Sequence, residues 1–347
     1  MYIKRILVII AIVGVLVCGW IAYNIYGAIF SPNTAFSNHK AYVFIPSDTS
    51  FDEVVTSIAP LLKDVTSFKS VADRKGYTTN IKPGHYVITK GMNNNDIVNT
   101  IRSQNTPVKV AFNNQERIED LAGRIASQIE ADSLSLLEAF TDTTFLSKHG
   151  FTQHTALTMY IPNSYQLFWN TSATTFRDRM LKEYNRFWNS SRLAKSKELG
   201  YTPQEIYTLA AIVQKETAKI DERPRVAGVY MNRLKRNIKL DADPTVIYAL
   251  KTVANDWGLV VKRVLYKDLE TDSPYNTYRN VGLPPGPIFM PDISAIDAVL
   301  NYEKHDYFYF VADIENFGYH KFAKSLSQHN ANSNAYRLWV ARQGIQR

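Results

Sequence analysis

One acidic residue occupies a position where an amphipathic helix should be apolar. The segment LAAIVQKETAKI covers residues 209–220. Its helix is expected to begin upstream, where Thr202 and Glu205 can form a capping box around Pro203. Apolar residues then recur at helical spacing, and the next position of that stripe is Glu216. A buried carboxyl group is costly unless it is paired or protonated.

Such a carboxyl group is suited to general acid catalysis. Apolar surroundings disfavour its charged form and raise its pKa, and the end of the helix acts in the same direction if the helix stops near Lys219. A carboxyl group that stays protonated near neutral pH can donate a proton to a glycosidic oxygen. The structural alternative is an ion pair of Glu216 with Lys215, Lys219 or a basic residue of the next helix. This segment alone favours that alternative.

Two aspartates are candidates for a second carboxylate. Asp241 and Asp243 lie in the segment KLDADPTVIYAL, and ordinary glycosidases use two carboxyl groups. Asp243 precedes Pro244, however, and Asp before Pro is common in turns and helix caps. Both interpretations stay open for these residues.

Other kinds of catalytic site find little support in the sequence. The seven histidines are scattered without an HExxH motif, and the single cysteine, Cys18, lies in an apolar run. Neither a metal centre nor a thiol nucleophile is therefore expected. The chain also has no GxSxG motif, no Walker loop and no dinucleotide fingerprint. We expect neither a metal nor a cofactor.

The N-terminus has the composition of a membrane anchor. Lys4 and Arg5 precede an uncharged apolar run over residues 6–23, which is long enough to cross a bilayer if the following residues help. No convincing signal-peptide cleavage site follows, so a retained span over residues 6–26 is expected. The positive-inside rule then places residues 1–5 in the cytoplasm and the remaining chain outside it.

Composition and charge are those of a globular protein with a basic surface. The 347 residues are 45% hydrophobic and 21% charged, which allows two or three domains. The net charge is +8, but the basic residues are dispersed. This dispersal and the expected location argue against nucleic acid as a partner. An anionic polymer or a lipid surface fits better, and a generally solvated basic surface is the simplest explanation.

The remaining chain divides into a small module and a larger region. After a polar linker at residues 27–40, residues 41–110 show a strand–helix–helix–strand order, with strands expected at Tyr42–Ile45 and His85–Thr89. This order fits a glycan-binding module of the LysM type and also other small α+β modules. The expected fold is α+β, with a single transmembrane helix, a LysM-like module and a mixed α/β domain over residues 111–347.

The C-terminal region is rich in residues suited to sugar recognition. The segment SPYNTYRNVGLPPGPIFMP places Asn276, Thr277 and Tyr278 before a proline-stiffened loop. Tyrosine rings can stack on sugars and amides can hydrogen-bond to them, although tyrosines pack equally well in cores. Further candidates, in the segment HKFAKSLSQHNAN, are Ser327, His329 and Asn330.

Seven segments in one order resemble the endolytic murein transglycosylases, the YceG-like family. They are AAIVQKET, VYMNRL, LDADPTVIYAL, YNTY, GLPPGPI, YFYFVAD and HKFAKSLSQHN. The resemblance runs from about Tyr42 to the C-terminus and is strongest between Tyr201 and Asn330. Each segment alone is weak. Their shared order, behind an anchor and a LysM-like module, identifies the family.

The resemblance implies a function and a mechanism. Members of the family are anchored in the bacterial inner membrane, with the catalytic domain in the periplasm or its equivalent. They cut nascent peptidoglycan strands internally between N-acetylmuramic acid and N-acetylglucosamine. The muramic 6-hydroxyl attacks in place of water, which leaves a 1,6-anhydro end. The glutamate of the Lys-Glu-Thr motif is the catalytic acid/base and matches Glu216, which reverses the preference for an ion pair. A role in ending strand growth beside peptidoglycan synthases is also implied.

The resemblance further implies a substrate groove. Residues at matching motif positions, which we expect to line it, are Asn232, Thr245, Asn276 and Tyr278. We expect the other groove candidates to be Asp243, Thr277, Ser327, His329 and Asn330.

The sequence departs from the family pattern at two places. Gln214 stands where relatives commonly have Glu, which supports Glu216 acting alone. Leu157 and Thr158 replace the Glu-Gly pair upstream of YIPNSYQLFW, so substrate contacts by residues 163–165 stay open. Two alternative functions also stay open. One is a water-using muramidase with Asp241 or Asp243 as second carboxylate, and the other is a non-catalytic peptidoglycan-binding scaffold.

Overall fold

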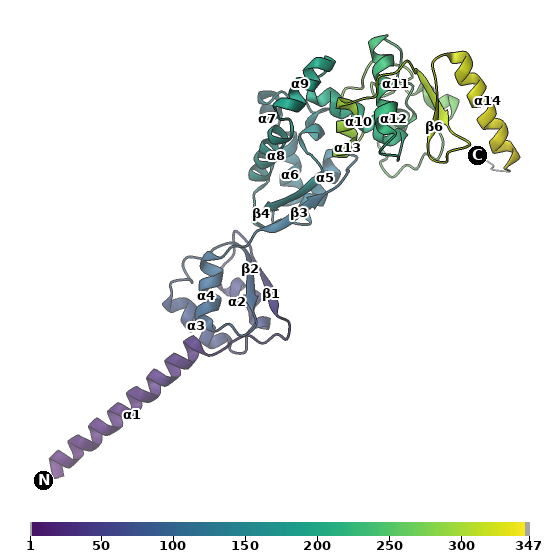
Figure 1. Ribbon diagram of the computed structural model, residues 1–347. Coiled ribbons are helices and arrows are strands. Elements are labelled where there is room, and N and C mark those ends of the chain that lie inside the picture. The colour runs from purple at the N-terminus through teal and green to yellow at the C-terminus, as the bar shows by residue number, and fades with distance from the viewer. Residues whose placement is uncertain (1, 344–347) are drawn as a thin grey trace. The chain divides into compact units, whose positions relative to one another are not determined.

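The computed structural model describes residues 2–343 and divides the chain into two compact units (Figure 1). The N-terminal unit contains the chain up to Val110 together with Gln128–Ala131 and Tyr165–Ser172. The C-terminal unit contains Ala111–Ser127, Asp132–Ser164 and the chain from Ala173 onward. The module expected at residues 41–110 lies within the N-terminal unit.

The N-terminal unit begins with a single long helix, α1 (Tyr2–Phe30). It is the one helix of the described chain that is long and apolar enough to cross a membrane. None of its residues is buried, but its C-terminal end packs against α3 (Val65–Arg74) and α4 (Asn94–Ser103). There the Asn94 side chain donates a hydrogen bond of 2.8 Å to the carbonyl of Ala28. The expected span of residues 6–26 lies inside α1.

The polar stretch expected as a linker at residues 27–40 is bound to the module. The helix continues through its first part to Phe30. The buried side chain of Asn33 then donates hydrogen bonds to the carbonyl of Asp64 at 2.8 Å and to Oδ1 of Asn94 at 2.7 Å. Paired polar groups can be buried without penalty, so these asparagines fasten the chain to the module.

The module has the strand–helix–helix–strand order that the sequence predicts. Its elements are β1 (Lys40–Ile45), α2 (Phe51–Ile58), the short 3₁₀-helix η1 (Ala59–Leu61), α3 and β2 (Gly84–Thr89). β1 and β2 pair antiparallel, with Lys40 opposite Thr89 and Ile45 opposite Gly84. Helix α2 begins with a capping box between Ser50 and Glu53. α4 and β3 (Val108–Phe112) follow.

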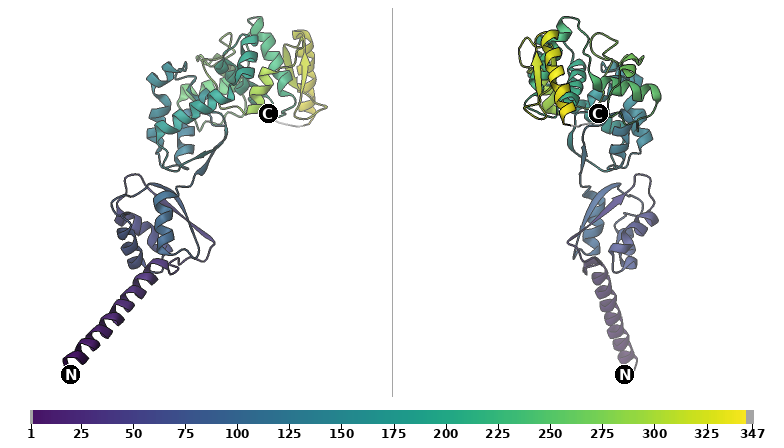
Figure 2. Two further views of the ribbon diagram at one scale, coloured as in Figure 1. Left: turned by 60° about the vertical axis from the view of Figure 1, so that its left-hand side comes forward. Right: turned by 90° about the vertical axis from the view of Figure 1, so that its right-hand side faces the viewer.

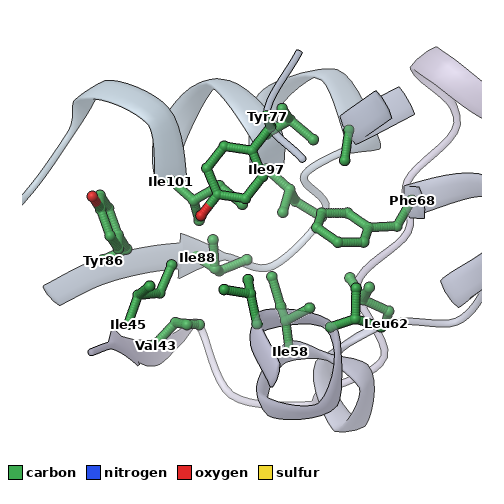
Figure 3. Packing of buried hydrophobic residues seen from close by; sticks show 14 of the residues in the cluster. Val43, Ile45, Ile58, Leu62, Phe68, Tyr77, Tyr86, Ile88, Ile97 and Ile101 are labelled. Atoms are coloured by element: carbon green, nitrogen blue, oxygen red, sulfur yellow. The ribbon is translucent and has the colours of Figure 1, made fainter. Parts of the chain in front are cut away.

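The core of the module is apolar (Figure 3). Ile45 and Ile88 from the paired strands pack with Ile58 of α2, Phe68 of α3 and Ile97 of α4. These five side chains are at most 1% exposed. Burial of a side chain of this size contributes about 1.5–3 kcal/mol. Because the chain has only one cysteine, this apolar packing takes the place of disulfides.

The C-terminal unit is mainly helical and carries small sheets. Its longer helices are α5 (Ile118–Ala126), α6 (Ser133–Thr141), α7 (Thr143–Lys148), α8 (Ala173–Phe187), α9 (Ser190–Leu199), α10 (Pro203–Glu216), α11 (Arg223–Lys235), α12 (Asp243–Ala254), α13 (Ile293–Leu300) and α14 (Leu326–Arg342). Short 3₁₀-helices are η2 (Ala156–Met159) and η3 (Tyr266–Glu270). β3 pairs with β4 (Asn163–Leu167), and β5 (Tyr309–Ala312) pairs antiparallel with β6 (His320–Ala323). The expectation of a mixed helix-and-sheet chain is confirmed.

Helix α14 lies along the β5–β6 hairpin, as the yellow segments of Figure 2 show. All four residues of β5 are half-buried. α14 has no buried residue, so it covers the hairpin only in part.

Helix α10 is the central helix of the C-terminal unit. It packs against α9, α11, α12, α13 and η2. Every residue from Ile206 to Val213 is buried, and the hydroxyl of Tyr207 donates a hydrogen bond of 3.0 Å to the carbonyl of Tyr160. A helix that is buried on all sides positions the side chains at its end rigidly.

Candidate active site

Glu216 is the last residue of α10. The predicted start of this helix is confirmed, since Thr202 and Glu205 form a capping box and Pro203 occupies the first turn. The helix ends at Glu216, and Thr217 is already extended. The carboxyl group therefore lies at the negative end of the helix dipole, which disfavours its charged form.

The surroundings of Glu216 raise its pKa. Burial is the largest cause and raises the pKa from its ordinary value of 4.5 to about 7. A hydrogen bond from the Tyr230 hydroxyl acts in the opposite direction, while the nearby charge of Asp243 raises the pKa further. His320 and Arg233 lower it by smaller amounts. The carboxyl group can therefore be protonated or ionised near neutral pH.

No ion pair neutralises Glu216 within residues 2–343. Lys215 and Lys219 point their ammonium groups at aromatic rings, 4.3 and 4.8 Å from the ring centroids. The basic residue of the next helix, Arg233, forms its salt bridge with Asp241 at 2.9 Å. The alternative of a merely structural ion pair for Glu216 is thus contradicted.

Arg233 holds Asp241 in a buried network. The guanidinium donates to the carbonyl of Leu240 at 2.9 Å and to the carbonyl of Phe308 at 2.7 Å, besides its salt bridge to Asp241. Burial raises the pKa of the Asp241 carboxyl, and Arg233 opposes this rise. Asp241 is thereby engaged as a partner of Arg233, which leaves Asp243 as the better candidate for a second carboxylate.

Asp243 and Tyr278 lie together beside Glu216. Asp243 is the first residue of α12, and the residue at the N-cap is Ala242, so the alternative of Asp243 as the helix cap is contradicted. Its carboxylate accepts a hydrogen bond of 2.7 Å from the Tyr278 hydroxyl. Both residues interact electrostatically with Glu216. They also line a pocket of about 950 Å³, which is large enough for sugar units.

Three predicted groove residues lie beneath the surface. Thr245, Asn276 and Thr277 are at most 1% exposed. The hydroxyls of Thr245 and Thr277 are 2.8 Å apart and hydrogen-bond to each other, and the Asn276 amide donates to the carbonyls of Leu269 and Thr271 at 2.9 and 2.8 Å. These groups hold the loops that carry Asp243 and Tyr278. None of the three is among the residues that line this pocket, and their place in the groove stays a prediction.

Asn232 also makes internal contacts. Its side-chain nitrogen donates to the carbonyls of His305 at 2.7 Å and Tyr307 at 3.0 Å. Since an amide has only two N–H donors, both are used. Asn232 thereby ties α11 to the chain that enters β5.

The three C-terminal candidates lie on α14. Ser327 and Asn330 are exposed, whereas His329 is half-buried and stacks on Tyr309 with ring centroids 5.2 Å apart. Burial and the charge of Arg233 lower the pKa of His329. Of these three residues, only His329 is linked to Glu216 in the described chain, because the charge of Arg233 affects the pKa of both side chains.

The loop after Glu216 contains a buried pair that the sequence analysis missed. Glu222 accepts hydrogen bonds from the Thr217 hydroxyl at 2.8 Å and from the backbone N–H and ring Nδ1 of His320 at 2.7 and 2.9 Å. Burial alone would raise the pKa of Glu222, but these hydrogen bonds prevail and lower it. The network fixes the chain that leaves α10 against β6. Glu222 shows no periodicity in the sequence, so only its proximity to the KET motif could have drawn attention to it.

Gln214 is directed toward the start of α13. Its amide donates to the Asp292 carboxylate at 2.8 Å and accepts from the Asp292 backbone N–H at 2.7 Å. Its role in the described chain is therefore structural. Among residues 2–343, no group of three or more His, Cys, Asp or Glu side chains could hold a metal ion.

Comparison with known proteins shows which family and which relatives this chain resembles. The YceG-like family matches residues 43–335. An endolytic murein transglycosylase of Bacillus subtilis is 28% identical, over 90% of this chain and 89% of the relative. One from Streptococcus pneumoniae is 30% identical over 85% of this chain, which spans only 58% of that relative's length. The crystal structure of a YceG-like protein from Listeria monocytogenes is similar, with a TM-score of 0.56, 28% identity and coverage of 85% of this chain and 99% of that one.

Proposed function

The chain belongs to the YceG-like family, and from this premise we propose that it is an endolytic murein transglycosylase. It cleaves the β-1,4 bond between N-acetylmuramic acid and N-acetylglucosamine within nascent peptidoglycan strands and leaves 1,6-anhydro ends. The substrate class rests on relatives that carry this name. The assignment of Glu216 as the acid/base rests on its position and surroundings.

In the first half of the reaction, Glu216 acts as a general acid. Its carboxyl group, with a pKa of about 7, donates a proton to the glycosidic oxygen as the bond to C1 of the muramic residue breaks. The leaving N-acetylglucosamine end thus departs as a neutral alcohol. The N-acetyl group of the substrate can stabilise the positive charge at C1, so this scheme needs no second protein carboxylate.

In the second half, the ionised Glu216 acts as a general base. It accepts the proton of the muramic 6-hydroxyl while that oxygen forms a bond to C1. The carboxyl group returns to its protonated state, and no water is consumed. The hydrogen bond from Tyr230 favours the ionised form, which supports proton exchange near neutral pH.

Two walls of the groove are assigned to surface residues. Asp243 and Tyr278 line the pocket beside Glu216, and they are the predicted groove residues that we propose to contact the glycan. Thr245, Asn276, Thr277 and Asn232 position these walls through their internal hydrogen bonds. We assign Ser327, His329 and Asn330 to the outer part of the groove.

The N-terminal unit supplies attachment in this proposal. Helix α1 is a retained, single-pass membrane anchor, with Lys4 and Arg5 in the cytoplasm and the rest of the chain outside the cytoplasmic membrane. The strand–helix–helix–strand order of the module supports LysM-like glycan binding. An anchored enzyme that cuts growing strands would end their elongation beside the peptidoglycan synthases.

The observation that carries the proposal is a partly buried carboxyl group at the end of a rigid helix, with a hydrogen bond from Tyr230 and without an ion pair in the described chain. We expect the Glu216→Gln protein to fold and bind glycan but to lose cleavage. Mass spectrometry of muropeptides, after digestion of uncross-linked strands by the full-length protein, measures this directly. Glu198→Gln, which changes an exposed carboxyl group on α9, is the matched control. Equal cleavage by wild type and Glu216→Gln would remove Glu216 from the mechanism.

One observation favours a second candidate, a water-using muramidase. Asp243 lies close enough to raise the pKa of Glu216, as a second carboxylate would. Reducing-end products, one water heavier than anhydro products, together with loss of cleavage in Asp243→Asn, would establish this alternative. Glycan binding without cleavage by the wild type would instead favour a non-catalytic scaffold.

A further inference from the structure

The pocket that Asp243 and Tyr278 line carries opposite charges on different parts of its lining. Asp243 and Tyr278 contribute the acidic part, next to the proposed acid/base. Lys262 and Arg263 contribute two cations from the segment that leads into η3. The proposed chemistry of glycan cleavage accounts for the first part and leaves the cationic part unexplained.

The two cations are not neutralised by the protein. Lys262 and Arg263 are both exposed, and within residues 2–343 neither takes part in a salt bridge or a side-chain hydrogen bond. The nearest acidic residue along this segment is Asp268, whose carboxylate accepts a hydrogen bond of 2.8 Å from the backbone N–H of Leu265. Asp268 therefore shapes the turn, and its charge partly offsets the cations without pairing with them.

The segment that carries the cations is fastened to the catalytic side of the pocket. The Asn276 amide donates to the carbonyl of Leu269, and its oxygen accepts a hydrogen bond of 3.0 Å from the backbone N–H of Tyr278. One buried side chain thus connects η3, which follows the two cationic residues, to the backbone of Tyr278.

The same segment offers an aromatic surface. Tyr266 lines the pocket and is 91% exposed, and the neighbouring Leu265 is 46% exposed. Exposed aromatic rings of this kind suit the apolar faces of sugars and the aliphatic parts of peptides. The pocket therefore combines an apolar face with two free cations.

We propose that Lys262 and Arg263 form a subsite for the carboxylates that a peptidoglycan strand carries next to the bond that is cut. This inference rests on the proposed function, because it identifies which part of the polymer the pocket reads. Arginine and lysine bind carboxylates through charge-assisted hydrogen bonds. The carboxylates can belong to the stem peptide or, where the peptide has been removed, to the lactyl group of muramic acid.

The test uses the full-length protein in detergent micelles and the double variant K262Q/R263Q. Three substrates separate the sources of charge: uncross-linked strands with stem peptides, the same strands after amidase treatment, and stem-bearing strands neutralised by carbodiimide amidation. On strands with free carboxylates, we expect KM to rise about tenfold and kcat to change less than about twofold. On the amidated strands, wild type and variant should have equal KM.

The control variant is K182Q/K197Q, which removes two exposed lysines from α8 and α9 that do not line the pocket. A KM effect confined to stem-bearing strands assigns the subsite to the peptide, and one confined to amidase-treated strands assigns it to the lactyl carboxylate. The proposal is overturned if K262Q/R263Q matches the control on both, or if its KM defect persists on amidated strands.

A binding measurement separates this inference from the proposed function. Dissociation constants for the same three strands are measured in the Glu216→Gln background, where cleavage does not interfere. A charge-dependent loss of affinity in K262Q/R263Q supports the subsite even if the wild type leaves hydrolytic products. Unchanged affinity, with normal cleavage by the wild type, overturns the subsite alone.

Discussion

In the N-terminal unit, the buried side chains are apolar or are uncharged amides and hydroxyls, apart from His85. The buried charged side chains of the described chain, one glutamate and three arginines, all lie in the C-terminal unit. They are Arg177, Glu222, Arg223 and Arg233. The module is held by apolar burial, and the site region by paired charges. Breaking a buried charge pair leaves the remaining partner uncompensated. The C-terminal unit therefore maintains a chemically useful arrangement at a cost that the module avoids.

The largest effect expected in this comparison concerns Glu216. Replacement by Gln removes the proton that the carboxyl group donates, and general acid–base catalysis of this kind contributes about 10²–10⁴-fold. We expect cleavage to fall by about 10³-fold or more while circular dichroism stays unchanged. Retention of more than a tenth of the wild-type rate would mean that another group supplies the proton.

The next effect tests the apolar core of the module in the N-terminal unit. Phe68→Ala empties space in the module core, where the ring is fully buried, and should lower the free energy of unfolding of the N-terminal unit by about 3–5 kcal/mol. Amide hydrogen exchange should report the loss within that unit. Phe317→Ala, at a ring that is 70% exposed, is the control and should change stability by much less. Equal losses for both variants would contradict the importance of this core.

A smaller effect tests the buried, hydrogen-bonded charges of the C-terminal unit. Glu222→Gln weakens the hydrogen bonds of the carboxylate to Thr217 and His320 and should lower the free energy of unfolding by about 1–3 kcal/mol. Because the pKa of Glu222 is lowered in the folded chain, its contribution is present above its ordinary value of 4.5 and is lost as pH falls. The destabilisation measured by urea titration should therefore be large at pH 7 and shrink below pH 5. A pH-independent loss would argue against this account.

Glu216 should show the opposite dependence on pH. Its raised pKa means that the folded chain binds the proton more tightly, so stability falls as pH rises from 4.5 to about 7. Glu216→Gln removes this penalty. We expect the variant to be more stable than wild type by about 1–3 kcal/mol at pH 8 and nearly equal at pH 4.5. Identical pH profiles of the melting temperature would show that the carboxyl group is not held in dry surroundings.

The smallest effect concerns Tyr230. Its hydroxyl lowers the pKa of Glu216 through a hydrogen bond, so Tyr230→Phe should move the alkaline limit of kcat/KM upward by about half a unit to one unit. The Tyr207→Phe variant, whose hydroxyl bonds to the carbonyl of Tyr160, should leave that limit in place. A downward shift in Tyr230→Phe would contradict the assigned hydrogen bond.

Sequence patterns predicted the parts of the molecule that depend on neighbours along the chain. The capping box at Thr202, the start of α10 and the strand order of the module all follow from local spacing, whereas α10 ends at Glu216 and not near Lys219. The helix α14 escaped prediction because it buries no residue and so carries no apolar stripe. The burial of Asn33 escaped prediction for a related reason, since this residue is polar in sequence but buried through its hydrogen bonds.

The site contacts could not be predicted because they join distant segments. Tyr230 reaches Glu216 from the next helix, and Asn276 fixes the Leu269 carbonyl and Tyr278 through single hydrogen bonds. Such contacts leave no periodic signal in the sequence. The resemblance to a family pointed to Asn276 and Thr245 as groove residues. In the structure both side chains are buried and hydrogen-bonded within the protein.

The junction between α1 and the module has a mechanical consequence. The Asn94 side chain donates a hydrogen bond to the carbonyl of Ala28 in the last turn of α1, and Asn33 donates one to Asn94. These contacts fix the orientation of α1 relative to the module. In a bilayer, the inclination of α1 would set the inclination of the whole module. A flexible insertion after Phe30 would release that alignment.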